Sequence, residues 1–413
     1  MIRFILIFLL AVFVIQNPKA QNNIDFYIDK ALQNSPLLKD YQNQVRANYI
    51  DSMRIRAGLL PQVNAISNST WSPVISGWGH DEVLTNGANI NALLSVSKEI
   101  VSRQNLQNQY QAIRLQSQSV LVAGKISEQD LKKSVTEQYI TTYGTWQLYG
   151  FNNDLLTLLK KEEQLFKKLA EQGVYKQTEY LSFLVTLQQQ ELQVAQIKNQ
   201  CQNNAATLNY LCGIVDTASQ PLSAPKLNLA DLPEFQGSVF SQQFIIDSLK
   251  ITNSDKQVDL SYKPKLNVFG DAGYYSSLAY QPWKNWGTTI GLNFSMPIYD
   301  GHQRKIQHDK NTIAEQTRQS YRDFYVKQYR QQINRLLQQL QANQQLAEQI
   351  TKQIKYAQVL IDADRKLLET GDVRVTDYII AINNYLNAKN TLVQNLIDKY
   401  QIINQINYWS RKK

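Results

Sequence analysis

An internal repeat constrains the architecture of this chain more than any single motif. Residues 172–180 (QGVYKQTEY) match residues 370–378 (TGDVRVTDY) when they are aligned 198 positions apart. Glycine, threonine, an acidic residue and tyrosine then coincide in both copies. The same offset aligns Asn209-Tyr210 with Asn407-Tyr408. Self-similarity at a fixed offset predicts two copies of one structural plan.

The repeat divides the chain into predicted segments. We assign residues 21–214 to the first copy and residues 238–413 to the second, joined by a proline-containing connector at residues 215–237. Each copy is predicted to contain a helix, a β-hairpin and long helices. The hairpins are expected at residues 62–97 and 265–296, where turn residues separate runs with a period of two.

The N-terminal residues 1–20 have the pattern of a secretory signal peptide. Arg3 precedes an apolar run from Phe4 to Ile15, and the expected cleavage site lies before Gln21. The run is shorter than the roughly 20 residues that a transmembrane helix needs. The mature chain has no run of 18 apolar residues, so any membrane-spanning part would be built from strands.

The strand pattern is strongest in residues 288–296. Apolar and polar residues alternate there, which predicts a strand with one apolar and one polar face. Nine residues is about the length of a tilted transmembrane strand. Aromatic residues crowd the ends of both hairpins and are predicted to lie at a membrane interface, with ordinary aromatic hairpin turns as the alternative: Trp71, Tyr274, Tyr275, Trp283 and Trp286.

Long helices are predicted after the second hairpin. From Tyr299 onward there is no proline, and the only glycines are Gly301 and Gly371. Between residues 336 and 368, apolar residues recur in steps of four and three, as in a coiled coil. Asn343 and Asp364 fall on these positions. They either set the packing register or face water beside a wider apolar face, and we favour the second interpretation.

Four amphipathic strands cannot form a closed barrel. In lipid, an open sheet leaves backbone groups at its edges unsatisfied, at a cost of several kcal/mol each, and the smallest usual barrel has about eight strands. The chain is therefore predicted to combine with further copies. Two, three or four copies would give barrels of 8, 12 or 16 strands, and the residues alone do not choose among them.

Composition argues against other classes of protein. The formal charge is +9, but lysine and arginine are dispersed among glutamine and asparagine, so no nucleic-acid partner is expected. Cys201 and Cys212 are too far apart along one helix for a disulfide and are expected to be buried. His80, His302 and His308 lack the spacing of a metal-binding or nucleophilic motif. No catalytic residue, cofactor or metal is therefore predicted.

Four motifs, in this order along the chain, resemble the TolC-like outer-membrane efflux channel family. They are IDKALQNSP at residues 28–36, LLP at 59–61, MPIYDG at 296–301, and Gly371 followed by TDY at 376–378. The resemblance covers essentially the whole mature chain. It implies a mostly α-helical fold with transmembrane β-strands, in which a duplicated long-helix coiled-coil α-barrel continues a trimeric 12-stranded β-barrel built from four strands per chain.

The resemblance also implies a location and partners. The expected assembly is a homotrimer in the outer membrane of a Gram-negative bacterium, in contact with outer-membrane lipid and with a periplasmic extension. The tips of that extension would dock on a periplasmic adaptor protein and an inner-membrane transporter. The implied function is a passive conduit for exported small molecules or proteins, in an efflux pump or a type I secretion system. The alternative is a periplasmic coiled-coil adaptor or envelope scaffold protein.

The resemblance assigns roles to several residues. Asp377 matches the first acidic position of the family's periplasmic gate, whereas the second position is Ile380. Alternatively, Asp377 is a carboxylate that stabilises a helix N-terminus. Arg374 and Glu179 are further gate candidates. Two more groups follow from the same motifs: Gly173, Val174, Gly371 and Val373 in the turns expected to contact the adaptor, and Pro297 and Gly301 at a passage from strand to helix. Gly173 and Gly371 are expected to adopt the left-handed conformation of a helix end.

Overall fold

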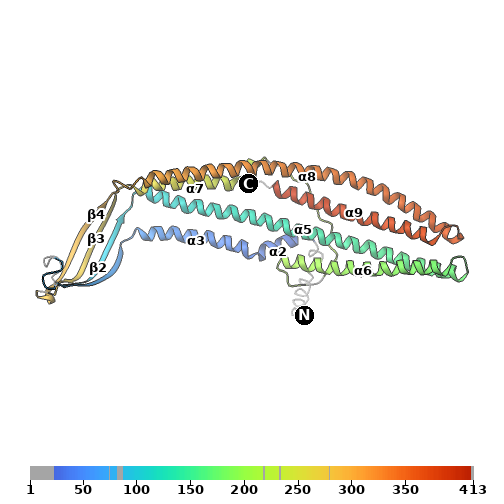
Figure 1. Ribbon diagram of the computed structural model, residues 1–413, viewed down its shortest axis with the longest axis horizontal. Coiled ribbons are helices and arrows are strands. Elements are labelled where there is room, and N and C mark those ends of the chain that lie inside the picture. The colour runs from blue at the N-terminus through green and yellow to red at the C-terminus, as the bar shows by residue number, and fades with distance from the viewer. Residues whose placement is uncertain are drawn as a thin grey trace, which may run out of the picture. The chain divides into compact units, whose positions relative to one another are not determined.

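The structure is a computed structural model that describes residues 23–73, 75–80, 87–216, 219–231, 234–278 and 280–410. The predicted signal peptide at residues 1–20 lies outside these ranges. Most described residues are helical, with the following elements in chain order (Figure 1): α2 (Ile24–Asn34), α3 (Pro36–Gly58), β1 (Gln62–Ser72), β2 (Gly87–Ile100), α5 (Arg103–Glu171), α6 (Gln177–Leu211), η3 (Phe235–Gly237), α7 (Val239–Ser261), β3 (Lys265–Ser276), η4 (Pro282–Lys284), β4 (Trp286–Ser295), α8 (Gln303–Thr370) and α9 (Val375–Trp409).

Contacts within the chain define two compact units. The helical unit comprises residues up to Lys39, Gly124–Ser241 and the residues from Tyr325 onward. The sheet unit comprises Asp40–Ala123 and Gln242–Phe324. Helices α5 and α8 each contribute residues to both units. No helix in the described ranges combines the length and hydropathy needed to cross a membrane.

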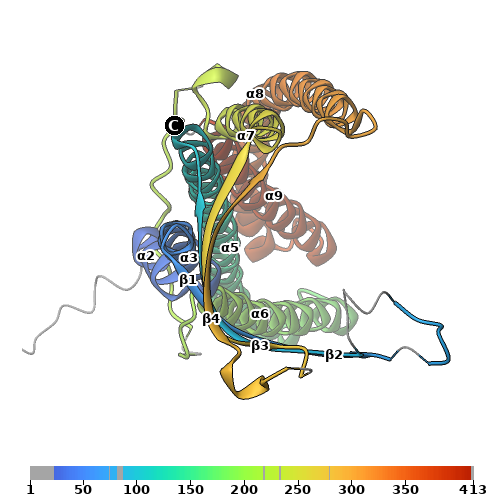
Figure 2. The same cartoon turned by 90° about the vertical axis from the view of Figure 1, so that its left-hand side faces the viewer.

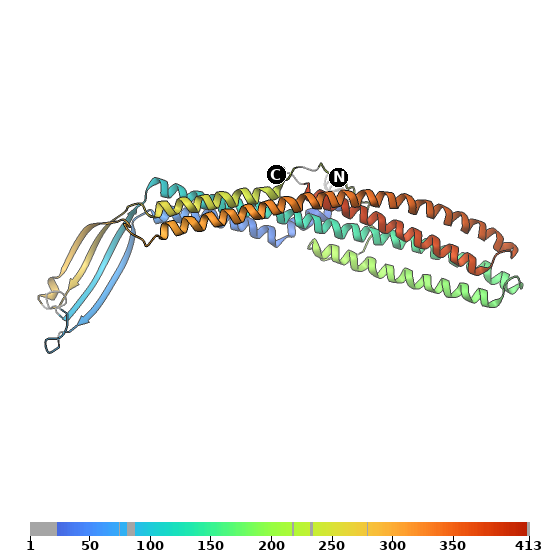
Figure 3. The same ribbon diagram turned by 45° about the horizontal axis from the view of Figure 1, so that its top comes forward.

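The sheet unit contains one antiparallel sheet with the strand order β1-β2-β3-β4. Leu94 on β2 pairs with Ala65 on β1 and with Ala272 on β3, so β2 and β3 join the two hairpins directly. Figure 3 shows the four strands side by side, with α3, α5, α7 and α8 meeting them at one end. Within the described residues, β1 and β4 are edge strands. The predicted combination of long helices with four strands is confirmed.

The two passages from strand to helix differ. After β2, Ser102 caps helix α5: its Oγ accepts a hydrogen bond from the Asn105 N–H at 3.2 Å. After β4, the chain passes Pro297, two residues beyond the strand, before α8 begins. There the Asp300 carboxylate accepts the backbone N–H groups of His302 and Arg304 at 2.9 and 2.8 Å. Gly301 has a φ of +65°, a conformation that glycine adopts readily.

The favoured interpretation of Asn343 and Asp364 is wrong. Both are buried, with 9% and 8% of their surface exposed, because α9 folds back along α8 and covers this face. The Asn343 side chain donates to the Asn395 carbonyl at 3.0 Å, and the Asn395 side chain donates to the Asn343 carbonyl at 3.1 Å. Burial raises the pKa of Asp364, and the Asp377 carboxylate raises it further. These polar residues belong to the helix packing.

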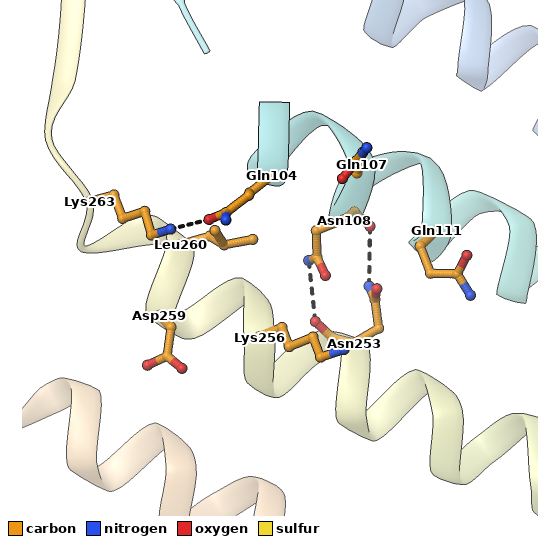
Figure 4. Close-up of a pocket in the computed structure, with 9 residues that line it drawn as sticks. All are labelled: Gln104, Gln107, Asn108, Gln111, Asn253, Lys256, Asp259, Leu260 and Lys263. Atoms are coloured by element: carbon orange, nitrogen blue, oxygen red, sulfur yellow. Dashed lines mark hydrogen bonds between the residues drawn. The ribbon is translucent and has the colours of Figure 1, made fainter. Parts of the chain in front are cut away.

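The sheet unit contains a second reciprocal asparagine pair. Asn108 on α5 and Asn253 on α7 each donate a side-chain N–H to the other's backbone carbonyl, both at 3.3 Å (Figure 4). Each pair supplies partners for buried amides at a helix contact, where an unbonded amide would cost free energy.

The two cysteines are also buried, as predicted, and burial raises the pKa of Cys201 to about 11 and that of Cys212 to about 12.

A charged cluster joins α7 to α8. His308 Nδ1 lies 2.6 Å from Asp255 Oδ1, and His308 Nε2 lies 3.0 Å from Asp259 Oδ1. Arg304 also donates to Asp259, and Asn311 also donates to Asp255. Both ring nitrogens can donate to carboxylates only in the imidazolium form. The Asp255 contact, followed by the Asp259 contact, raises the pKa of His308.

We expect stability to depend on pH through His308. Its raised pKa means that its contribution is complete below its unfolded pKa of about 6.5 and is lost as the pH rises through the folded value. The thermal midpoint of the wild type should exceed that of His308→Gln near pH 6, and the difference should narrow towards pH 9. The control is His302→Gln, because the His302 ring packs edge-on against Tyr299 rather than against a carboxylate. An equal pH slope in wild type and His308→Gln would contradict the prediction.

Candidate functional site

Two turns with the same backbone geometry lie at one end of the helical unit. They join α5 to α6 and α8 to α9, and they lie close together (Figure 1). Gly173 and Gly371 both have a φ of +78°, as predicted for a left-handed helix end. In each turn, the backbone N–H of the residue after the glycine donates a hydrogen bond of 3.0 Å to the preceding helix. Val174 donates to the Leu169 carbonyl, and Asp372 donates to the Leu367 carbonyl. The sequence repeat is thus reproduced in the hydrogen bonds.

Tyr175 links the two turns. Its hydroxyl lies 3.0 Å from the Leu368 carbonyl oxygen and 2.9 Å from the Val373 carbonyl oxygen, so it donates to the end of α8 and to the turn that follows. The turns also touch directly, since a side chain at Gly371 would come within 3.1 Å of Val174. The four residues predicted to contact an adaptor, Gly173, Val174, Gly371 and Val373, are therefore held in one surface.

An apolar core supports the turns. The Phe166 ring lies 4.5 Å from the Phe183 ring and 6.1 Å from the Tyr378 ring, measured between centroids. Tyr378 is completely buried, and burial raises its pKa. Beside it, the buried Glu162 on α5 forms an ion pair of 2.9 Å with Arg365 on α8. Sequence analysis missed Tyr175, Glu162 and Arg365, because only the fold brings these segments together.

The predicted gate residues occupy the first turns of two helices. Asp377 lies three residues after Arg374, the N-cap of α9, and accepts its guanidinium in two hydrogen bonds of 3.0 and 3.1 Å. The side chains of Arg374 and Asp377 are 77% and 39% exposed. Glu179 occupies the equivalent place on α6 and accepts the Lys176 backbone N–H at 3.1 Å. Ile380 is exposed one turn further along α9. The two interpretations of Asp377, as gate carboxylate and as helix stabiliser, are compatible.

Strand register separates the sheet into two chemically different faces, because paired residues of antiparallel strands point to the same side. Ile290 and Leu292 are 87% and 71% exposed. We call their side the apolar face: Val63, Ala65, Ser67, Ser69, Trp71, Ala88, Ile90, Ala92, Leu94, Val96, Lys98, Ile100, Leu266, Val268, Gly270, Ala272, Tyr274, Ser276, Trp286, Thr288, Ile290, Leu292 and Phe294. The opposite side, the polar face, includes Asn64, Asn68, Asn91, Asn267, Asp271 and Asn293.

The predicted interface aromatics do not all lie on one face. Trp71, Tyr274 and Trp286 are on the apolar face, towards the hairpin tips. Tyr274 and Trp286 are paired, and their rings lie 5.8 Å apart. Tyr275 follows Tyr274 on the strand, so it points to the polar face, where its hydroxyl accepts a hydrogen bond from the Asn89 side chain at 3.2 Å. Trp283 lies in η4, between β3 and β4, and is exposed.

The arrangement of the sheet can be followed from the strand end. Figure 2 shows β1 to β4 as one curved layer in consecutive order. A shift of the strand pairing by one residue would move every side chain to the opposite face. The register is therefore fixed wherever one face of the sheet must avoid water. Phe269 reinforces the β3–β4 pairing, because its ring covers Gly291, where a side chain would approach the ring to 2.4 Å. A sheet with these two faces suits a boundary between lipid and water.

Comparison with known proteins identifies the fold. No protein-family model and no curated protein matches the sequence. Among solved structures, CusC, described in connection with transmembrane channel formation, superposes with a TM-score of 0.78 at 14% identity, over 94% of this chain and 92% of that one. The outer membrane protein VceC of Vibrio cholerae gives 0.74 at 13%, over 94% and 96%. The CmeC outer membrane channel of Campylobacter jejuni gives 0.73 at 14%, over 94% and 85%. The predicted TolC-like fold is confirmed.

We expect Tyr175→Phe to loosen the tip without unpacking it. The ring contact with Phe166 is retained, but the Leu368 and Val373 carbonyls lose their donor, a loss worth about 1 kcal/mol. Hydrogen exchange should accelerate at residues 371–374, and the free energy of unfolding should fall by that amount. Tyr180→Phe is the control, since its hydroxyl donates only to the Glu163 side chain. Equal protection in wild type and Tyr175→Phe would rule out the proposed link.

Proposed function

We propose that this chain is the outer-membrane channel component of a tripartite efflux pump or a type I secretion system. It would be a passive conduit for exported small molecules or proteins in a Gram-negative bacterium. The observation that carries the proposal is the sheet, with one exposed apolar face, one polar face and two edge strands. The solved neighbours support it, since the descriptions of OprN and MtrE also name outer-membrane channels.

The proposed assembly is a homotrimer in which the sheet edges of neighbouring copies pair. In lipid, the unpaired N–H and C=O groups of β1 and β4 need partners. The β1 edge of one copy would pair with the β4 edge of the next, and three copies would close 12 strands. The apolar face would then contact lipid, with Trp71, Tyr274 and Trp286 near one interface, and the polar face would line the lumen. This arrangement is supported by the superposition of the chain on CusC and VceC, which covers most of the length of both proteins in each case.

The remaining assignments extend the same proposal. Residues 1–20 would be the signal peptide, and residues 21–214 and 238–413 would be structural repeats joined by the connector at 215–237. The surface formed by Gly173, Val174, Gly371 and Val373 would dock on a periplasmic adaptor, which links the channel to an inner-membrane transporter. The chain would have no catalytic role, because its neighbours are described as channels.

The gate proposal concerns Asp377. Three copies would place three exposed carboxylates around a narrow mouth and favour cations there. Arg374 would reduce this field by pairing with Asp377 in its own chain. Glu179, whose carboxylate is committed to the Lys176 N–H, would contribute less.

Edge pairing can be tested by cross-linking between copies. With one cysteine at Asn64 on β1 and another at Thr289 or Asn293 on β4, we expect oxidation to produce covalent trimers in membranes. The native cysteines are buried and should not react. As a control, cysteines are placed at Asn64 on the edge strand β1 and at Asn267 on the interior strand β3. This pair should give no covalent trimer, because β3 does not lie at a sheet edge. A protein that is released without detergent would instead favour the soluble adaptor or scaffold.

The gate can be tested by single-channel recording in planar bilayers. We expect discrete conductance with cation selectivity, and Asp377→Ala should weaken both the selectivity and the block by divalent cations, on the order of threefold. Asp372→Ala removes a carboxylate from the same turn, where it is hydrogen bonded to Thr370, and should change selectivity less. If Asp377→Ala conducts like the wild type, the channel assignment stands and the gate assignment is lost.

A further inference from the structure

The apolar face carries a single charge. Among the strand residues that the structure describes, Lys98 is the one charged side chain on this face. It is exposed and forms no ion pair within the described ranges. A lysine facing lipid is costly at the centre of a membrane but tolerated near its boundary. Lys98 lies two residues before the end of β2, beside the start of the helices, which suits such a boundary.

Lys98 lies at an apolar groove. Strand β1 begins at Gln62, opposite Ser97, so Lys98 has a paired neighbour only on β3. A groove of about 760 Å³ lies at this end of the sheet, and Lys98 is one of the residues that line it. Apart from Lys98, Ser97 and Glu99, its lining is apolar: Leu59, Pro61, Val96, Ile100, Val101, Val268, Phe269, Gly270 and Ile290. Register places Glu99 on the polar face, opposite to Lys98. Gly270 keeps the floor open, since a Cβ at this position would meet no atom closer than 3.8 Å.

We propose that this groove binds one anionic phospholipid per chain. The Lys98 ammonium would donate hydrogen bonds to the phosphate oxygens, while an acyl chain lies on the apolar floor. The site rests on the proposed function, because this face meets lipid only in a membrane. The volume is within the range of pockets that bind small apolar ligands. An ammonium near a bilayer surface attracts anionic lipid by an amount equivalent to about fivefold in binding.

Native mass spectrometry of the detergent-extracted assembly can test the site. The protein is titrated with phosphatidylglycerol and, separately, with phosphatidylethanolamine of identical acyl chains. We expect one tightly held phosphatidylglycerol per chain. Lys98→Gln should weaken phosphatidylglycerol binding about fivefold. It should weaken phosphatidylethanolamine binding less, because that lipid has the same phosphate but no net charge. Gly270→Leu should weaken both lipids, because the added side chain fills the groove without backbone strain.

Two matched variants serve as controls. Lys265→Gln removes a charge from the polar face, and Ala272→Leu also places a leucine on the apolar face, outside the groove. Neither should change lipid binding. Equal phosphatidylglycerol affinity in wild type and Lys98→Gln, or no preference between the two lipids in the wild type, would overturn the site and leave the channel intact. A protein that is soluble without detergent would overturn both.

Discussion

The hydrogen-bonding needs of four strands govern the rest of this structure. Each strand carries a row of N–H and C=O groups that must be paired before its apolar face can enter lipid. Within the chain, β2 and β3 satisfy each other across the two repeats, which leaves only the outer edges of β1 and β4 open. Duplication therefore makes a wider sheet but does not close it. In the proposed membrane setting, a chain with two edges of this kind would depend on copies of itself.

The two turns of the helical unit share their backbone geometry but not their side-chain contacts. The turns of the helical unit share the same glycine conformation and the same closing hydrogen bonds. Tyr175, however, aligns with Val373, and the tyrosine bonds to the valine carbonyl. One repeat thus supplies the hydroxyl that fixes the other. The strand-to-helix passages have diverged in the same way, with a serine cap before α5 and an aspartate cap with a positive-φ glycine before α8.

The local sequence pattern was sufficient to predict some features of the structure and insufficient to predict others. Alternation identified β4 and its two faces, and glycine positions identified the two left-handed turns, because both depend on nearby residues. Burial of Asn343 depends on Asn395, which lies on another helix, and the periodicity of α8 contains no information about that partner. The side of the sheet that Tyr275 faces depends on strand register, which the crowding of aromatic residues in the sequence does not contain. The ion pair of Glu162 and Arg365 joins helices that are distant in sequence.

The weakness of one surface ion pair bears on how the tip would work. Arg374 and Asp377 are three residues apart, with 77% and 39% of their side chains exposed, and ion pairs at the surface contribute about 0–1 kcal/mol. Little free energy therefore keeps Arg374 paired with Asp377 of the same chain. An acidic group on a docking partner could draw Arg374 away and leave Asp377 facing the mouth with its full charge. Docking and cation preference would then be coupled through one arginine side chain, without any movement of the buried core around Tyr378.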